Sequence, residues 1–158
     1  MPKTLIIVIL DESGSMGTKK SVELDNVPEL TAHNYLPGGM TALYDAIAEG
    51  VRLADRDKTN DERVICVIMT DGEENSSRET TKEQVRHIIS GYEAKGDWTF
   101  VYIGENPERW SRDAGMSATN AINYDHINTR NNYTNATSAV SQFRKSLSKQ
   151  STNLFSKD

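Results

Sequence analysis

Three stretches of the chain are apolar at almost every position. They are LIIVIL (5–10), VICVIM (64–69) and WTFVYI (98–103). Continuous apolar runs of this kind, rich in β-branched and aromatic residues, are typical of strands that are buried on both faces in parallel sheets. The pattern therefore predicts three parallel strands at the centre of the fold.

The segments between and after these runs repeat their apolar residues at helical spacing. The three stripes are Leu43, Ile47, Val51 and Ala54; Val85, Ile88, Ile89 and Tyr92; and Ala136, Val140, Phe143 and Leu147. In the second helix, either Thr80 or Thr81 is expected to be the N-cap. Glu83 and Gln84 lie three residues beyond these threonines and suit a capping box, and Gly96 suits the helix end.

A shorter helix is expected from Pro107 to about Ala114. Asn106 is a suitable cap, and proline is favoured in the first turn of a helix because its missing N–H would be unpaired there anyway. Gly115 then ends the helix.

The C-terminal third carries the weakest signals. The segment ATNAINY (118–124) indicates a short last strand, 125–135 a polar loop, and the last apolar stripe a helix over 133–149. Strands that alternate with helices predict an α/β fold: a doubly wound, mainly parallel sheet with helices on both faces and right-handed crossovers. The length of 158 residues suits one domain over 1–158.

Composition narrows the class of protein. Charged residues make up 26% and the formal net charge is -5, so a general affinity for nucleic acid or for an anionic membrane is not expected. Cys66, the only cysteine, lies within an apolar strand and is expected to be a packing residue. No stretch approaches the roughly 20 apolar residues of a membrane helix, and the N-terminal segment lacks the pattern of a signal peptide. We therefore expect a cytoplasmic protein.

Oxygen-bearing side chains follow the first two strands directly. DESGS (11–15) follows the first strand, and TDGEEN (70–75) follows the second. Because ligands bind at the carboxyl ends of parallel strands, Asp11 and Asp71 should converge if these strands are neighbours. We call the edge of the sheet at the carboxyl ends of the strands its rim. Thr41, between a Pro-Gly-Gly loop and the first helix, is expected at the same rim.

These side chains form an all-oxygen ligand set without histidine or cysteine. The candidate metal ligands are Asp11, Ser13, Ser15, Thr41 and Asp71. Such oxygens suit Mg²⁺ or Mn²⁺, which prefer six ligands. Five side chains therefore leave at least one coordination position open. An anionic oxygen from outside would be a favourable last ligand.

The three motifs DESGSM, GGMTAL and TDGEEN, in this order, resemble the metal-ion-dependent adhesion site (MIDAS) of von Willebrand factor A (vWA) domains. Over most of its length the chain resembles little-characterised bacterial and bacteriophage proteins with such domains. The resemblance assigns Asp11, Ser13 and Ser15 to the first motif, and Thr41 and Asp71 to the others. It implies a non-enzymatic, metal-binding module in which a protein partner supplies an Asp or Glu to the bound Mg²⁺.

One interval departs from the family pattern. Only the 25 residues 16–40 separate Ser15 from Thr41, whereas a helix, two strands and their connections need roughly 35 or more. We therefore expect the first helix and second strand of the family to be absent, leaving a short strand at 21–24 and an extended loop. The uncovered side of the first strand would then be closed by a homodimer, by segment exchange or by the last helix.

Two other functions stay open. A metal-dependent hydrolase or phosphotransferase would use Asp11 as nucleophile or the cation as Lewis acid, although no second Asp follows Asp11 at the spacing of haloacid-dehalogenase-type enzymes. A metal-free scaffold or assembly protein is the other. Glu12, Glu73 and Glu74 are expected to be solvated residues of the rim, and Trp110 is the aromatic residue best placed to contact a partner.

Overall fold

A computed structural model of the chain describes residues 2–10, 42–70, 74 and 76–155. Its elements are β1 (Lys3–Leu10), α1 (Leu43–Asp57), β2 (Glu62–Met69), α2 (Lys82–Ala94), β3 (Trp98–Gly104), α3 (Pro107–Ala114), a 3₁₀ turn (Ala118–Asn120), β4 (Ala121–Asn123) and α4 (Thr129–Lys145). Strands and helices alternate along the chain, which confirms the predicted α/β class. The three long strands and the short last strand all lie where the apolar pattern predicts them.

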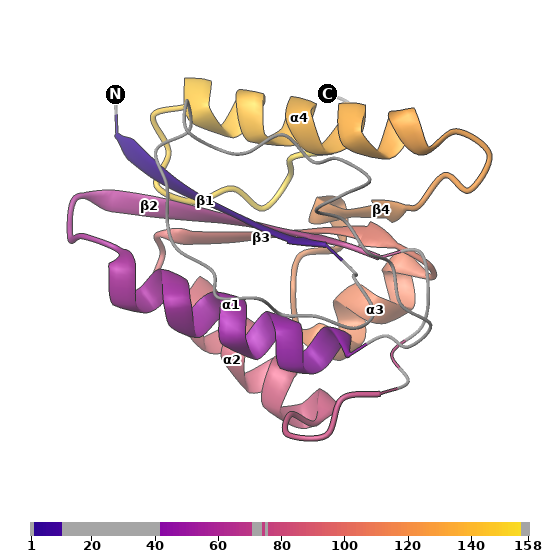
Figure 1. Cartoon of the computed structure of the whole chain (residues 1–158). Coiled ribbons are helices and arrows are strands. Elements are labelled where there is room, and N and C mark those ends of the chain that lie inside the picture. The colour runs from indigo at the N-terminus through magenta and orange to yellow at the C-terminus, as the bar shows by residue number, and fades with distance from the viewer. Residues whose placement is uncertain (1, 11–41, 71–73, 75, 156–158) are drawn as a thin grey trace, which may run out of the picture.

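The four described strands form one parallel sheet in the order β1-β2-β3-β4 (Figure 1). Strands β1 and β2 pair in a register that runs from Lys3 opposite Glu62 to Leu10 opposite Met69. Strand β3 continues this register with Ile103 opposite Met69. The carboxyl ends of β1 and β2 therefore lie side by side.

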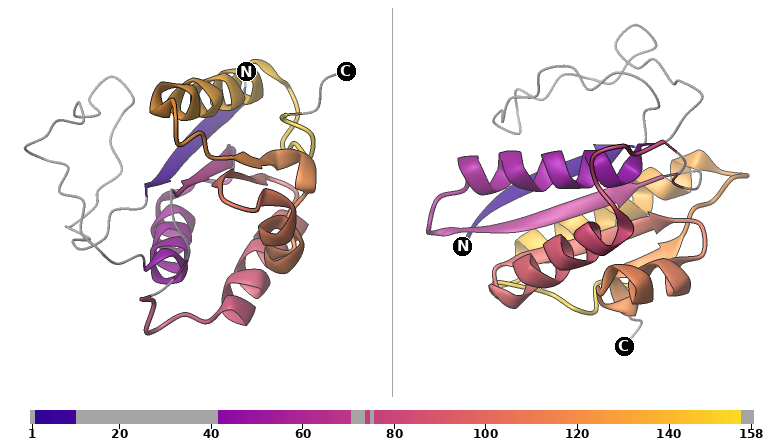
Figure 2. Two further views of the ribbon diagram at one scale, coloured as in Figure 1. Left: turned by 90° about the vertical axis from the view of Figure 1, so that its right-hand side faces the viewer. Right: turned by 90° about the horizontal axis from the view of Figure 1, so that it is seen from below.

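Helices cover both faces of this sheet, as predicted: α1, α2 and α3 lie on one face and α4 lies on the other (Figures 1 and 2). Because successive strand residues point to opposite faces, Cys66 packs toward α1 and α2, whereas Val67 packs toward α4. Cys66 is fully buried, and this burial raises the pKa of its thiol to about 12. None of the described helices is both long and apolar enough to cross a membrane.

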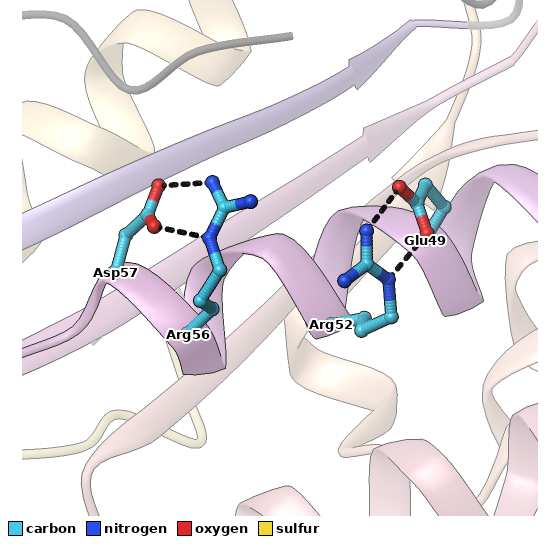
Figure 3. Close-up of polar contacts among 4 residues, drawn as sticks. All are labelled: Glu49, Arg52, Arg56 and Asp57. Atoms are coloured by element: carbon cyan, nitrogen blue, oxygen red, sulfur yellow. Dashed lines mark hydrogen bonds and ion pairs between the residues drawn. The ribbon is translucent and has the colours of Figure 1, made fainter. Parts of the chain in front are cut away.

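Helix α1 buries the four apolar residues of the predicted stripe. It lies close to β1, since a Cβ atom on Gly50 would be only 3.0 Å from Cδ1 of Ile9. Its outer side carries ion pairs between residues close in the sequence. Arg52 donates two 2.7 Å hydrogen bonds to the carboxylate of Glu49 (Figure 3). Exposed pairs of this kind contribute little to stability, so α1 is held mainly by its buried stripe.

The ends of α2 confirm the predicted signals. Thr81 is the N-cap and forms a complete capping box with Gln84. The chain turns after the helix at Gly96, whose φ of 80° lies in the left-handed region that favours glycine.

Helix α3 has the predicted bounds, and Gly115 ends it with a φ of 73°. The prediction that the Asn106 side chain caps this helix is wrong. Asn106 occupies the N-cap position, but its φ is 46° and its side chain makes no capping hydrogen bond. Asparagine is among the few residues other than glycine that adopt this left-handed conformation readily, so the residue shapes the turn through its backbone.

Helix α4 begins earlier than predicted, inside the segment expected to be a loop. Asp125 accepts hydrogen bonds from the backbone nitrogens of Ile127 and Asn128 through one carboxylate oxygen. The Asn132 side chain bonds both the backbone nitrogen and the backbone oxygen of Asp125. These side chains fix the turn at residues 125–128, immediately before the helix, which the apolar stripe alone does not reveal.

The C-terminal end of α4 is set by a buried arginine of β2. Arg63 is 1% exposed and donates hydrogen bonds to the backbone oxygens of Arg144, Ser146 and Ser148. A positive charge at a helix C-terminus is favourable and satisfies carbonyls that have no partner within the helix. The helix therefore ends at Lys145, and Leu147, predicted to be part of the buried stripe, is 77% exposed.

The predicted shortening of the 16–40 interval, with its strand at 21–24, lies outside the described residues. Among the described strands, β1 is at the edge of the sheet. Helix α4 packs on Ile65, Val67 and Val101 of β2 and β3, and Val8 of β1 is 51% exposed.

Candidate functional site

All five predicted metal ligands lie outside the residues that the structure describes. They are Asp11, Ser13, Ser15, Thr41 and Asp71. The structure therefore does not show whether these side chains come together. It does describe the residues that adjoin three of them in the chain: Leu10 before Asp11, Ala42 after Thr41, and Thr70 before Asp71.

The described ends of β1 and β2 meet at one rim of the sheet. Leu10 and Met69 are paired in register. Thr70, which follows Met69, is 1% exposed, and its backbone nitrogen donates a 3.0 Å hydrogen bond to the oxygen of Ile103 on β3. The chain thus leaves β1 and β2 at adjoining points, which is the condition under which Asp11 and Asp71 are expected to converge.

The start of α1 is joined to the segment that follows β2. The Glu74 carboxylate accepts a hydrogen bond from the backbone nitrogen of Tyr44 at 2.9 Å. The Ser77 hydroxyl accepts another from the backbone nitrogen of Asp45 at 3.1 Å. Because Ala42, at the N-cap position, has no side-chain group to offer, α1 is capped by residues from a distant part of the chain.

Glu74 is held in place by further donors. One carboxylate oxygen accepts from the backbone nitrogens of Ser76 at 3.0 Å and Ser77 at 2.6 Å. The other oxygen, which binds Tyr44, also accepts from the Ser77 hydroxyl at 2.8 Å. The prediction that Glu74 is merely a solvated residue of the rim is therefore wrong: its carboxylate organises the turn.

Asp45 forms a second link between the same two segments. Its carboxylate accepts hydrogen bonds from the backbone nitrogens of Arg78, Glu79 and Thr80 at 2.9, 3.2 and 2.7 Å. Partial burial raises the pKa of Asp45, but these hydrogen bonds outweigh it and hold the pKa below its ordinary value. We call the contacts of Glu74 and Asp45 with these backbone nitrogens the carboxylate clasp.

The clasp also sets the electrostatics of the rim. The first turn of a helix carries a partial positive charge, which disfavours a cation by roughly 0.3–1 kcal/mol at an exposed position. Glu74 and Asp45 place two carboxylates at the first turn of α1. Their negative charge offsets the helix dipole, so this part of the rim is compatible with a cation.

A cavity of about 300 Å³ lies next to the clasp, between α1, α2, α3 and the end of β3. Tyr44 and Glu74 belong to its wall as well as to the clasp. Burial, followed by the charge of Glu74, raises the pKa of Tyr44. Local sequence patterns do not predict this cavity, because its walls come from segments that are far apart in the chain.

An aromatic pair forms the side of the cavity nearest β3. The rings of Tyr102 and Trp110 are stacked with centroids 4.1 Å apart and planes at 8°. Gly104 makes this arrangement feasible, since a Cβ atom there would be only 2.3 Å from the Tyr102 ring. The side chain of Tyr102 therefore lies over Gly104 of the same strand, where there is no side chain to displace it.

Within the part of the chain that the structure describes, no three His, Cys, Asp or Glu side chains are grouped so that they could hold a metal ion. His126 pairs with Glu105 at 3.1 Å on the surface.

Comparison with known proteins adds no family assignment. No protein-family model, curated protein or solved structure matches this chain. The α/β class follows from the described elements, and the resemblance to vWA domains depends on the motifs in the sequence.

Proposed function

We propose that this protein is a metal-dependent interaction module that binds another protein and catalyses no reaction. Its ligands for Mg²⁺, or Mn²⁺, are Asp11, Ser13, Ser15, Thr41 and Asp71. Two carboxylates and three hydroxyls form a hard oxygen set that fits these cations. When bound, the cation supplies a positive centre for an Asp or Glu side chain of the partner.

The paired carboxyl ends of β1 and β2 carry this proposal. Leu10 and Met69 are in register, and Asp11 and Asp71 follow these two positions within two residues. Parallel strands present the residues after their carboxyl ends to the same edge of a sheet, where ligands bind in folds of this class. This adjacency supports a shared role for the two carboxylates.

The carboxylate clasp supports the inclusion of Thr41. It fixes the start of α1, directly after Thr41, against residues 76–80, shortly after Asp71. Ordered neighbours reduce the conformational entropy that ligand binding must overcome. Glu74 and Asp45 are thus positioning residues, with their own oxygens already engaged by backbone donors.

Partner capture tests this function. The immobilised full-length chain is exposed to lysate with Mg²⁺, with EDTA, and with Mg²⁺ restored after EDTA. We expect a protein that is retained, lost and regained in these three conditions, and that Asp11→Ala does not retain. Glu12→Gln, a change at the next residue that is not a proposed ligand, should retain it.

The same variants separate the other two functions. Turnover of para-nitrophenyl phosphate that requires Mg²⁺ and is lost in Asp11→Ala would contradict a purely binding role and indicate an enzyme. Capture that is identical with Mg²⁺ and EDTA would contradict metal dependence and indicate a metal-free scaffold.

A further inference from the structure

The cavity beside the clasp has the dimensions of a small binding site. Its volume is about 300 Å³, at the lower end of the range for ligand pockets in proteins. Its walls combine aromatic, basic and acidic side chains. All of these residues are described by the structure and none is a proposed metal ligand.

The aromatic part of the wall is fixed in orientation. Trp110 stacks on Tyr102, which is 2% exposed and donates a 3.1 Å hydrogen bond from its hydroxyl to the backbone oxygen of Glu105. Trp110 itself is only partly buried, and Tyr44 contributes from α1. Aromatic faces and edges bind other rings in stacked or edge-to-face geometry, so this wall suits a planar aromatic group.

At one side of the cavity, two basic side chains lie near a single carboxylate. Lys82 Nζ lies 2.6 Å from Oδ2 of Asp113, and Arg109 Nε lies 3.8 Å from the same oxygen. The hydrogen bond from Lys82 lowers the pKa of Asp113. Two cations thus share one carboxylate, and the side chain of Arg109 is 70% exposed, with guanidinium donors left for a further anion.

The remaining acidic residues of the wall are already engaged. The two oxygens of Glu74 accept four hydrogen bonds within the clasp. Glu105 is paired with His126. Arg109 differs from these residues, because its guanidinium has donors left that a bound carboxylate can engage.

We propose that this cavity binds an aromatic group that carries a nearby carboxylate. The ring packs against Trp110 and Tyr44, and the carboxylate binds the guanidinium of Arg109. This site goes beyond the proposed function, because it uses no metal ligand and its occupation requires no cation. Two sources share this chemistry: a free aryl carboxylic acid, and a protein segment in which an acidic residue adjoins an aromatic one.

Nuclear magnetic resonance tests the proposal on the ¹⁵N-labelled full-length chain in EDTA. The probes are phenylpropionate, its neutral amide and phenylpropylamine. We expect phenylpropionate to shift the indole N–H signal of Trp110 saturably, leave that of the buried Trp98 unchanged, and bind more tightly than the amide or amine. Arg109→Gln should weaken phenylpropionate about tenfold, whereas Arg112→Gln, exposed on the same helix, should not.

Equal binding of the three probes, the absence of a saturable shift at Trp110, or an equal effect of the two arginine substitutions would overturn the proposal. A blocked Gly-Phe-Asp-Gly peptide distinguishes the sources. Tighter binding of the peptide than of phenylpropionate supports a protein segment, and the reverse supports a free acid. Since all titrations are done without divalent cation, their outcome is independent of the metal-dependent function.

Discussion

The carboxylate of Glu74 caps helix α1 at the backbone nitrogen of Tyr44, 2.9 Å away and 30 positions earlier in the chain. The contact joins the segment after β2 to the helix that follows the proposed ligand Thr41. It thereby links two of the three places along the chain from which the proposed metal site is assembled. A single side chain thus both caps α1 and joins its first turn to the segment that follows β2.

Removal of the Glu74 carboxylate should destabilise the fold measurably. We expect Glu74→Ala to lower the free energy of unfolding by about 1–2 kcal/mol, as for other lost helix caps. Glu74→Gln should also be destabilising, because its amide oxygen can accept from only two of the four donors and its amide nitrogen, itself a donor, would face the other two. Urea unfolding measures both, with Glu79→Gln as a control at an exposed position in the same loop. Equal losses for Glu79→Gln and Glu74→Gln would contradict the capping role.

Arg63 should be the most sensitive arginine of the described chain. Arg63→Met leaves the carbonyls of Arg144, Ser146 and Ser148 without this donor, and we expect the free energy of unfolding to fall by at least about 3 kcal/mol. Arg52→Met, which removes an exposed ion pair of α1, should leave stability nearly unchanged. Denaturant unfolding of the two variants side by side gives the comparison. A small loss for Arg63→Met would show that water replaces the guanidinium easily.

Gly104→Ala should disturb the aromatic wall. The added methyl group would lie 2.3 Å from the Tyr102 ring and must displace it, together with its stack on Trp110. We expect a loss of about 1–3 kcal/mol, typical of overpacking. In a double-mutant cycle, Tyr102→Leu should remove most of the penalty of Gly104→Ala. Simple additivity of the two changes would rule out this steric explanation.

Glu93 should make stability depend on pH in the neutral range. Burial raises the pKa of Glu93 to about 7 from an ordinary value of 4.5. Between these values the folded chain holds a proton that the unfolded chain has released, so the contribution of Glu93 to stability falls as pH rises from about 4.5 to about 7. Glu93→Gln should remove this contribution. Urea unfolding at a series of pH values tests it, and parallel curves for the two proteins would be the opposite result.

Much of the fold was predictable because its signals are local. The apolar run 98–103 became β3, and the stripe that begins at Leu43 became the buried face of α1. The end of α4 was not predictable in this way. It depends on Arg63, whose contact with the oxygen of Arg144 spans 81 positions of the chain. No periodicity near Leu147 carries that information.

The candidate site likewise has features that local sequence patterns predict and features that they do not. The apolar runs predicted both strands but not that they are neighbours; the structure shows that β1 and β2 pair in register up to their carboxyl ends. The capping role of Glu74 was missed, because it joins two segments that no local pattern relates. The sequence does hold one clue: Ala42 at the start of α1 has no side-chain group that could cap the helix.

Calorimetric titration of the chelator-treated chain with Mg²⁺, and separately with Mn²⁺, tests the proposed metal site most directly. We expect one ion per chain to bind the natural protein. Binding should be abolished or greatly weakened by Asp11→Asn and by Asp71→Asn, which keep the size of the side chain but remove its charge, and kept by Glu12→Gln. No heat of binding in the natural protein, or unchanged affinity in both aspartate variants, would contradict a metal ion bound at this rim.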